Sequence, residues 1–140
     1  MRETDLLDGY LAAEREKPFA WGVGNGDCLL FVAGWGLVLN GVDFAAHLRG
    51  TYSDEAGARA AIETEGGAIS YFDKVAGQRR QGGSFFRGDI GLVSFNGWHL
   101  GMICTGSLWV AKTGEGGLRY LRRPADIAWA PNPARLGAFY

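Results

Sequence analysis

The chain has 140 residues, of which 47% are hydrophobic and 21% are charged, so it carries enough apolar material for one folded domain. Its 14 Lys and Arg residues nearly balance 15 Asp and Glu residues, and the formal net charge of -1 argues against nucleic acid or an anionic membrane as a partner. The N-terminus shows no basic and apolar signal peptide, and no apolar run reaches the ~20 residues of a membrane span. We therefore expect a single domain over residues 1–140, made in the cytoplasm and without a membrane span.

The first part of the chain predicts helices. Apolar residues recur at helical spacing over residues 4–17, where Thr4 can cap the helix and Pro18 stops it. The segment over residues 29–39 is apolar on all sides, which indicates a buried central helix. The later predictions in this part are a helix over residues 54–65 capped by Ser53, a shorter helix over residues 69–75, and an exposed loop over residues 78–83.

The ends of the central helix carry capping residues. Asn25 or Asp27 can cap its N-terminus, and Asn40 with Gly41 can close its C-terminus. Cys28 then lies in the first turn, beside unpaired backbone N–H groups and the positive end of the helix dipole. Both features stabilise a thiolate over a thiol, so Cys28 is a candidate nucleophile. The competing interpretation is that Cys28 is a small buried hydrophobic residue, as most free cysteines are.

From Gly88 onward the pattern changes to short apolar or aromatic runs separated by turns, which is typical of strands. The predicted strands cover residues 90–95, 98–105, 108–113, 118–121 and 127–130. Asn96-Gly97 is a strong signal for a two-residue hairpin turn. The further predicted turns are Gly106-Ser107 and residues 114–117. The sequence therefore predicts the α+β class, with N-terminal helices packed on a C-terminal antiparallel meander of about five strands.

Two histidines are available as a base for Cys28. His47 has no strand or acidic partner nearby in the sequence and fits an exposed helix residue. His99 opens the run WHLGMIC, where strand alternation places it on one face with Gly101 and places Cys104 on the other. Cys104 therefore packs in the core, and no disulfide with Cys28 is expected if Cys28 meets His99. The competing interpretation is that His99 is a structural residue of its strand.

No metal or cofactor is expected. Cys28, Cys104 and His99 lack the spacing of metal ligands, and strand alternation separates two of them. The string GVGNGD is not followed by the Gly-Lys-Ser/Thr of a phosphate-binding loop.

Three segments together resemble the core motifs of the NlpC-type cysteine peptidases. They are WGVGNGDCLLF, GDIGLVSF and HLGMICTG, which follow one another in this order within residues 18–113. Members of this family are papain-like hydrolases that cut bacterial cell-wall peptides. The resemblance implies a papain-like fold in which the central helix carries Cys28. It also implies a likeness to small domains encoded in the tail clusters of phages, prophages and gene-transfer agents, whose particles deliver them to the wall.

The resemblance assigns roles to the residues of these motifs. Cys28 would be the nucleophile and His99 the general base, and the chemistry would be acyl transfer to water through a thioester. The backbone N–H of Cys28 would donate to the oxyanion, with Asp27 as the cap that supports this end of the helix. The structural residues of the motifs would be Trp21, Gly22 and Asp89.

The chain departs from the family pattern at three places. Many members carry a tyrosine where Phe19 stands, and Phe19 has no hydroxyl to support an oxyanion. Leu29 and Leu30 follow the cysteine in place of the usual Ser-Gly pair, so the substrate subsite differs. No His or Asn stands where the third, orienting residue of the family is expected. The candidates for that role are Lys112 and Thr113, with Asn96 or a backbone carbonyl as substitutes.

Three functions fit these observations. The leading one is a hydrolase that cleaves an amide bond in bacterial cell-wall peptide and assembles with the tail-tip proteins of a phage or phage-like particle. The second is a catalytically decayed structural or binding module of a tail tip, which the departures at Phe19, Leu29 and Lys112 favour. The third is an amidase or acyltransferase that uses the same two residues on a different acyl group.

Overall fold

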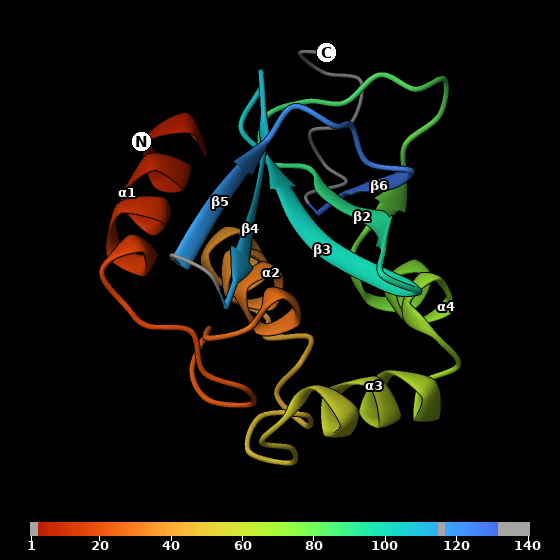
Figure 1. Cartoon of the computed structure of the whole chain (residues 1–140). Coiled ribbons are helices and arrows are strands. Elements are labelled where there is room, and N and C mark those ends of the chain that lie inside the picture. The colour runs from red at the N-terminus through yellow and green to blue at the C-terminus, as the bar shows by residue number, and fades with distance from the viewer. Residues whose placement is uncertain (1–2, 115–116, 132–140) are drawn as a thin grey trace.

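The computed structural model describes residues 3–114 and 117–131, with side chains described from Leu6 onward. Within these ranges the chain forms four helices and one antiparallel sheet of six strands (Figure 1). The helices are α1 (Glu3–Arg15), α2 (Cys28–Asn40), α3 (Glu55–Thr64) and α4 (Ala68–Val75). The strands are β1 (Gln78–Arg79), β2 (Ile90–Phe95), β3 (Trp98–Cys104), β4 (Trp109–Thr113), β5 (Gly117–Leu121) and β6 (Ile127–Ala130). This is the predicted α+β class.

The strands lie in the order β1-β6-β2-β3-β4-β5. Strands β2 to β5 form a meander, in which each strand pairs with the next, but the prediction of about five meander strands is wrong for the last one, because residues 127–130 do not pair with β5. Strand β6 then returns to the free edge of β2, and β1 adds to the outer edge of β6. The prediction of a loop over residues 78–83 is therefore wrong at its start, because Gln78 and Arg79 pair with Ala130 and Trp129. A strand of two exposed residues is too short to show the alternation of apolar and polar side chains that identifies strands in a sequence. Only its pairing with β6 defines it as a strand.

The turn between β2 and β3 is the predicted two-residue hairpin. Asn96 and Gly97 both have positive φ, 48° and 83°, which is typical of a type I′ turn. Phe95 and Trp98 face each other beside the turn, and Ser94 is the partner of His99 one step farther along. The turn thus fixes which residue of β2 lies next to His99.

Helix α2 is the buried central helix that the sequence predicts. Asp27 caps its N-terminus by accepting a hydrogen bond from the backbone N–H of Leu30 at 2.9 Å. Gly41 closes its C-terminus in the left-handed conformation, with φ of 73°. For α3 the cap is Asp54, which accepts from Gly57 N at 2.7 Å, and the prediction of Ser53 is wrong by one residue. Serine and aspartate cap helices about equally well, so the sequence alone could not decide between the neighbouring Ser53 and Asp54.

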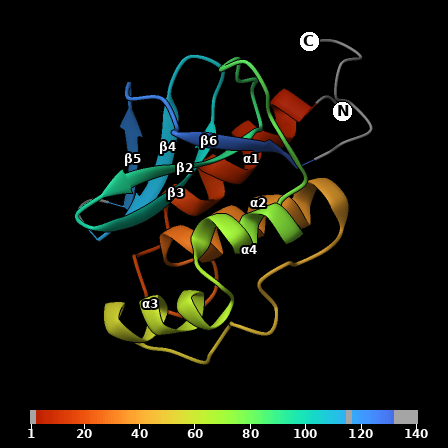
Figure 2. The same cartoon turned by 90° about the vertical axis from the view of Figure 1, so that its right-hand side faces the viewer.

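The sheet carries apolar side chains on both faces. Figure 2 shows α2 and α4 beneath the sheet and α3 farther from it. The main core lies between the helices and this face and includes Trp35 and Ile103. A smaller cluster on the other face includes Met102, Cys104 and Trp109. The predicted alternation along β3 is therefore confirmed, and both Cys104 and the cysteine of α2 are free thiols.

Gly101 lets β3 approach the start of α2. A Cβ at this position would lie 2.8 Å from Cγ2 of Val32 and 3.3 Å from the carbonyl oxygen of Cys28. Real side chains do not reach the first of these distances, so any larger residue would push the strand away from the helix. The close contact places the first turn of α2 directly against the strand that carries His99.

We expect Gly101→Ala to lower the free energy of unfolding by about 1–3 kcal/mol, the usual range for an overpacked core. Urea denaturation measures the change. The control is Gly9→Ala, at an exposed position of α1 where a Cβ meets nothing within 4 Å. This change should raise stability by about 0.5–1 kcal/mol through helix propensity. Equal stability of Gly101→Ala and the wild type would contradict the close approach.

Candidate active site

Cys28 and His99 line the same small cavity between α2 and β3. The cavity has a volume of about 30 Å3, room for roughly one water molecule. Cys28 reaches it from the first turn of α2, His99 reaches it from the start of β3, and Gly101 lies in its wall. The structure thus brings together the two residues that the sequence selects from motifs far apart in the chain.

Two larger grooves share residues with this cavity. The cysteine groove, of about 530 Å3, is lined by Cys28, Trp21 and Trp98. The histidine groove, of about 600 Å3, is lined by His99 and again by Trp98. Lys112 and Thr113 also line the cysteine groove, and Ser94 also lines the histidine groove. An extended ligand that occupies both grooves would therefore pass both the thiol and the imidazole.

The Cys28 thiol is buried, and burial raises its pKa to about 11. The backbone N–H groups of Gly101, Leu29 and Cys28 itself act in the opposite direction and lower this pKa, whereas the nearby Asp27 charge raises it. The predicted effect of the helix N-terminus thus exists, but the prediction of a stabilised thiolate is wrong for the resting protein. Loss of solvation outweighs the N–H groups, and the sequence could not show how deep the sulfur lies.

Asp27 is the structural centre of this end of α2. Its side chain is buried, and its Oδ1 accepts from Leu30 N while its Oδ2 accepts from Gly22 N at 2.9 Å. The hydroxyl of Tyr52 donates to the same Oδ2 at 2.8 Å. These contacts confirm Asp27 as a cap and brace. Sequence reasoning missed Tyr52, because nothing in the pattern around it indicates a contact with Asp27, which lies 25 residues earlier in the chain.

Gly22 and Trp21 shape the loop that leads into α2. Gly22 has φ of 74°, and a Cβ there would lie 2.0 Å from the backbone oxygen of Tyr52, so no larger residue fits. Its carbonyl accepts a hydrogen bond from Gly50 N at 2.8 Å. The ring of Trp21 packs edge-on against Phe19, with centroids 4.8 Å apart, and lines both the cavity and the cysteine groove. The motif residues therefore build the wall beside the sulfur.

Asp89 is part of a separate, structural ion pair. Its carboxylate accepts from Nε and Nη2 of Arg80 at 2.9 and 3.0 Å and from Phe86 N at 2.9 Å. Burial raises its pKa, while Arg80 and the Phe86 N–H act to lower it. These contacts hold the segment before β2 and lie outside the cavity lining. The structural role that the motif implies agrees with them.

The Lys112 ammonium lies at the end of α1 and not at His99. The side chain is fully buried, and Nζ donates to the carbonyl oxygens of Glu14 at 3.0 Å and Lys17 at 2.9 Å. Burial lowers the pKa of Lys112, and the Glu14 carboxylate, 3.9 Å away, raises it. Lys112 therefore fastens α1 to β4, which is a structural role that the sequence did not suggest.

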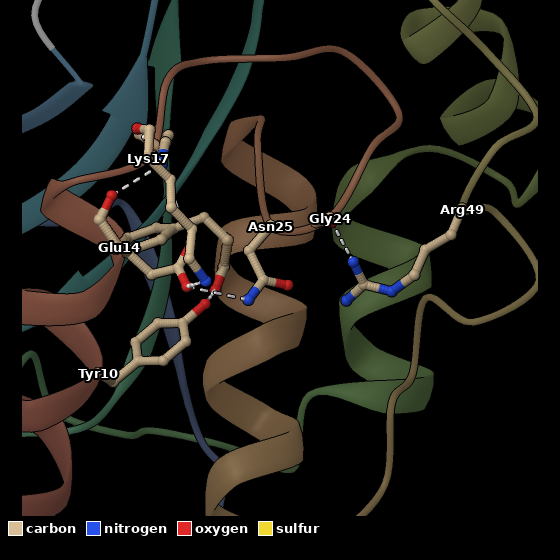
Figure 3. A network of polar contacts seen from close by, with 8 residues as sticks. Tyr10, Glu14, Lys17, Gly24, Asn25 and Arg49 are labelled. Carbon is tan, nitrogen blue, oxygen red and sulfur yellow. Dashed lines mark hydrogen bonds and ion pairs between the residues drawn. The ribbon is translucent and has the colours of Figure 1, made fainter.

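The same network holds the loop before α2, as Figure 3 shows. Glu14 is buried, and its Oε2 accepts from Lys17 Nζ at 2.8 Å and from Asn25 Nδ2 at 3.4 Å. On the other side of the loop, Arg49 donates to the carbonyl oxygen of Gly24. The loop is thus held from α1 and from the segment after α2, which fixes the start of the cysteine helix.

The other proposed orienting residues, Thr113 and Asn96, are not among the residues that line the small cavity. Thr113 lines the cysteine groove, whereas His99 lines the small cavity and the histidine groove. Asn96 occupies the hairpin turn, and its carbonyl oxygen accepts from Arg59 Nη2 at 3.4 Å. Neither is placed by these contacts as a partner of the ring.

Two residues near His99 were missed by the sequence analysis. Ser94 is the strand partner of His99 on β2, and Asp126 accepts a hydrogen bond from Ser94 N at 2.9 Å. The Asn96-Gly97 turn could have predicted that Ser94 lies beside His99, because a two-residue hairpin turn fixes which residues of the two flanking strands pair. Asp126 carries no such signal, since its position depends on the return of β6 to the edge of β2.

In residues 3–114 and 117–131, no three or more His, Cys, Asp or Glu side chains gather closely enough to hold a metal ion. Over the same ranges, every helix falls short of the length and apolar character needed to cross a bilayer.

The thiol makes protein stability depend on pH in a definite direction. Folding raises its pKa from 9.0 to about 11, so its contribution to stability is complete below about pH 9 and is lost as the pH rises to about 11. We expect the free energy of unfolding of the wild type, relative to Cys28→Ala, to fall by about 2–3 kcal/mol between about pH 8 and pH 11. Urea denaturation of both proteins at each pH measures this difference. A difference that does not change with pH would contradict the deep burial of the sulfur.

Comparison with known proteins gives a family. No curated protein and no solved structure matches the chain. Residues 1–130 match a family described as a domain of unknown function, DUF6950, and this range contains Cys28, His99 and Asp126. The match covers nearly the whole sequence, and the chain therefore belongs to the DUF6950 family.

Proposed function

We propose that the chain is a cysteine hydrolase of the NlpC type that cleaves amide bonds in bacterial cell-wall peptides. The observation that carries the proposal is the shared cavity, which is lined by both a helix-terminal cysteine and a strand histidine and shares residues with two larger grooves. A thiol nucleophile and an imidazole base together can carry out acyl transfer to water. The choice of cell-wall peptide, and of a place in a phage or phage-like tail, comes from the motif resemblance.

The proposed reaction begins from a neutral thiol. Because burial raises the pKa of Cys28 to about 11, the sulfur keeps its proton at neutral pH until a substrate carbonyl is in place. His99 then takes the proton as the sulfur–carbon bond forms, and it returns the proton to the amine as the carbon–nitrogen bond breaks. Water attacks the thioester and gives one proton to His99, and the carboxylic acid leaves as the thiol is restored.

The start of α2 supplies the electrostatic part of the proposal. The first-turn N–H groups of Cys28 and Leu29, which lower the pKa of the sulfur, are the donors that would stabilise negative charge as it develops on the carbonyl oxygen. One well-placed donor of this kind lowers a barrier by about 3 kcal/mol. Phe19 lines the cysteine groove and offers no hydroxyl, so the backbone donors carry this task.

The grooves suit an extended peptide. Trp21 and Trp98 present aromatic surface in the cysteine groove, and the guanidinium of Arg59 lies 4.6 Å from the centroid of the Trp98 ring. Arg59 and Trp98 also line the histidine groove, so one cation–aromatic pair borders both. A peptide chain that carries carboxylates matches this combination of aromatic and cationic surface.

A second candidate function is a binding module on the same fold with no catalysis. The raised pKa of Cys28 favours it, and so does the binding of the Lys112 ammonium by backbone carbonyls instead of the imidazole. In that case the grooves would hold cell-wall peptide or a tail-tip protein without cleaving it. The two candidates differ in whether a substrate bond breaks.

Hydrolysis of cell-wall peptides separates these candidates. The purified protein is incubated with isolated peptidoglycan and with soluble stem peptides, and new amine and carboxyl ends are detected by mass spectrometry. We expect cleavage by the wild type and its loss by several orders of magnitude in Cys28→Ala and His99→Ala, because each removes a reacting group.

The control variant is Cys104→Ala, which removes the other buried thiol on the opposite face of the sheet. It should keep the activity of the wild type. Cleavage that survives in Cys28→Ala would overturn the proposed role of the thiol. Binding of the peptides by the wild type with no cleavage would support the binding module instead.

A further inference from the structure

We propose that Asp126, acting through the hydroxyl of Ser94, positions the imidazole of His99. The inference rests on the proposed function only in taking His99 as the base. It assigns the orienting role to the β2 side of the histidine strand, whereas the sequence offered Lys112 and Thr113 on the β4 side.

The hairpin register places the Ser94 side chain beside His99. Phe95 and Trp98 flank a two-residue turn, and such a flanking pair exchanges both backbone hydrogen bonds. The next pair, Ser94 and His99, is therefore of the non-hydrogen-bonded kind, in which the side chains share one face and lie closest together. Both residues also line the histidine groove. The Ser94 hydroxyl is thus a neighbour of the ring.

The same register turns the Ser94 N–H away from β3 and toward Asp126. Strand β6 begins at Ile127, which pairs with Leu92, and Asp126 N donates to Leu92 O at 2.8 Å. The Asp126 carboxylate then continues the ladder by one step, because its Oδ2 accepts from Ser94 N at 2.9 Å. Asp126 is therefore fixed at the edge of β2 by two backbone contacts.

The charge of Asp126 suits an acceptor role. The Ser94 N–H lowers the pKa of this carboxyl most, the Ser94 side chain contributes in the same direction, and the nearby Arg123 and His99 lower it further. Arg123 lies 4.0 Å from Oδ1, which leaves Oδ2 to Ser94. Asp126 is thus a carboxylate at neutral pH that lies within electrostatic reach of His99.

A hydroxyl between a carboxylate and an imidazole can fix the ring. The Ser94 hydroxyl donates its proton to Asp126, and its lone pairs then accept a ring N–H of His99. The protonated nitrogen faces Ser94, so the other nitrogen carries the lone pair that the base needs toward Cys28. An ammonium could not accept that N–H, and the Lys112 ammonium is already bound to the carbonyls of Glu14 and Lys17.

The tautomer of His99 tests the proposal without any substrate. Long-range proton–nitrogen NMR of the full-length protein reports which ring nitrogen carries the proton, and His47 is an internal reference in the same spectrum. We expect one dominant tautomer of His99 in the wild type. Ser94→Ala and Asp126→Ala should each shift it toward a mixture, and Ser94→Thr, which keeps the hydroxyl, should restore it.

The controls separate positioning from folding. Ser94→Ala leaves the backbone bond between Ser94 N and Asp126 in place, so a merely structural role of Asp126 predicts no change of tautomer in this variant. Asp54→Ala removes another exposed aspartate that accepts a backbone N–H, and it should leave His99 unchanged. Identical His99 tautomers in the wild type, Ser94→Ala and Asp126→Ala would overturn the proposal.

Kinetics distinguish this inference from the proposed function. With a cleaved peptide in hand, Ser94→Ala should lower kcat by about 100-fold with little change in KM, as expected when a reacting group is misplaced by about 1 Å. Ser94→Thr should recover most of the loss. A tautomer shift without hydrolysis by any variant supports the positioning and overturns the hydrolase. If Ser94→Ala changes neither the rate of hydrolysis nor the tautomer of His99, the hydrolase is supported and the positioning role of Ser94 and Asp126 is overturned.

Discussion

The buried carboxylate of Asp27 is the contact on which the rest of the site depends. It joins three parts of the chain, because it accepts hydrogen bonds from the first turn of α2, from Gly22 in the preceding loop and from Tyr52 in the segment after the helix. A buried carboxylate is stable only when its oxygens find donors, and here each donor comes from a different element. The cysteine next to it therefore has a fixed place before any ligand arrives.

This arrangement has a chemical consequence for the thiol. The charge that holds the helix end lies beside the sulfur and raises its pKa, in the same direction as burial. The chain thus holds the Cys28 sulfur firmly in place but keeps it protonated, in contrast to a stored thiolate that would react with small electrophiles. In the proposed hydrolase, activation would depend on His99 and on a substrate carbonyl that occupies the cavity, so the burial that keeps the thiol protonated would also contribute to selectivity.

Local pattern was enough for much of the fold. The apolar run of α2, the Asn96-Gly97 turn and the alternation along β3 predicted their elements, and together they brought Cys28 and His99 to one cavity. The failures share a cause, which is contact between distant segments. Strand β1 exists only beside β6, Tyr52 reaches Asp27 across the loop, and Asp126 meets Ser94 because β6 returns to β2. Burial depth is likewise a property of the whole fold, so the raised pKa of Cys28 could not be foreseen.

The placement of the two cysteines on opposite faces of the sheet bears on how the protein tolerates oxidants. A disulfide needs its two Cα atoms within about 7 Å and side chains that point toward each other, and strand β3 with the core beneath it stands between these two sulfurs. Air or peroxide outside a reducing compartment therefore cannot trap Cys28 in an internal cross-link. Its remaining oxidation route is direct attack on the sulfur, which a buried and protonated thiol resists. At a bacterial cell wall, where the proposed function would place the protein, Cys28 would therefore stay reduced without a reductase.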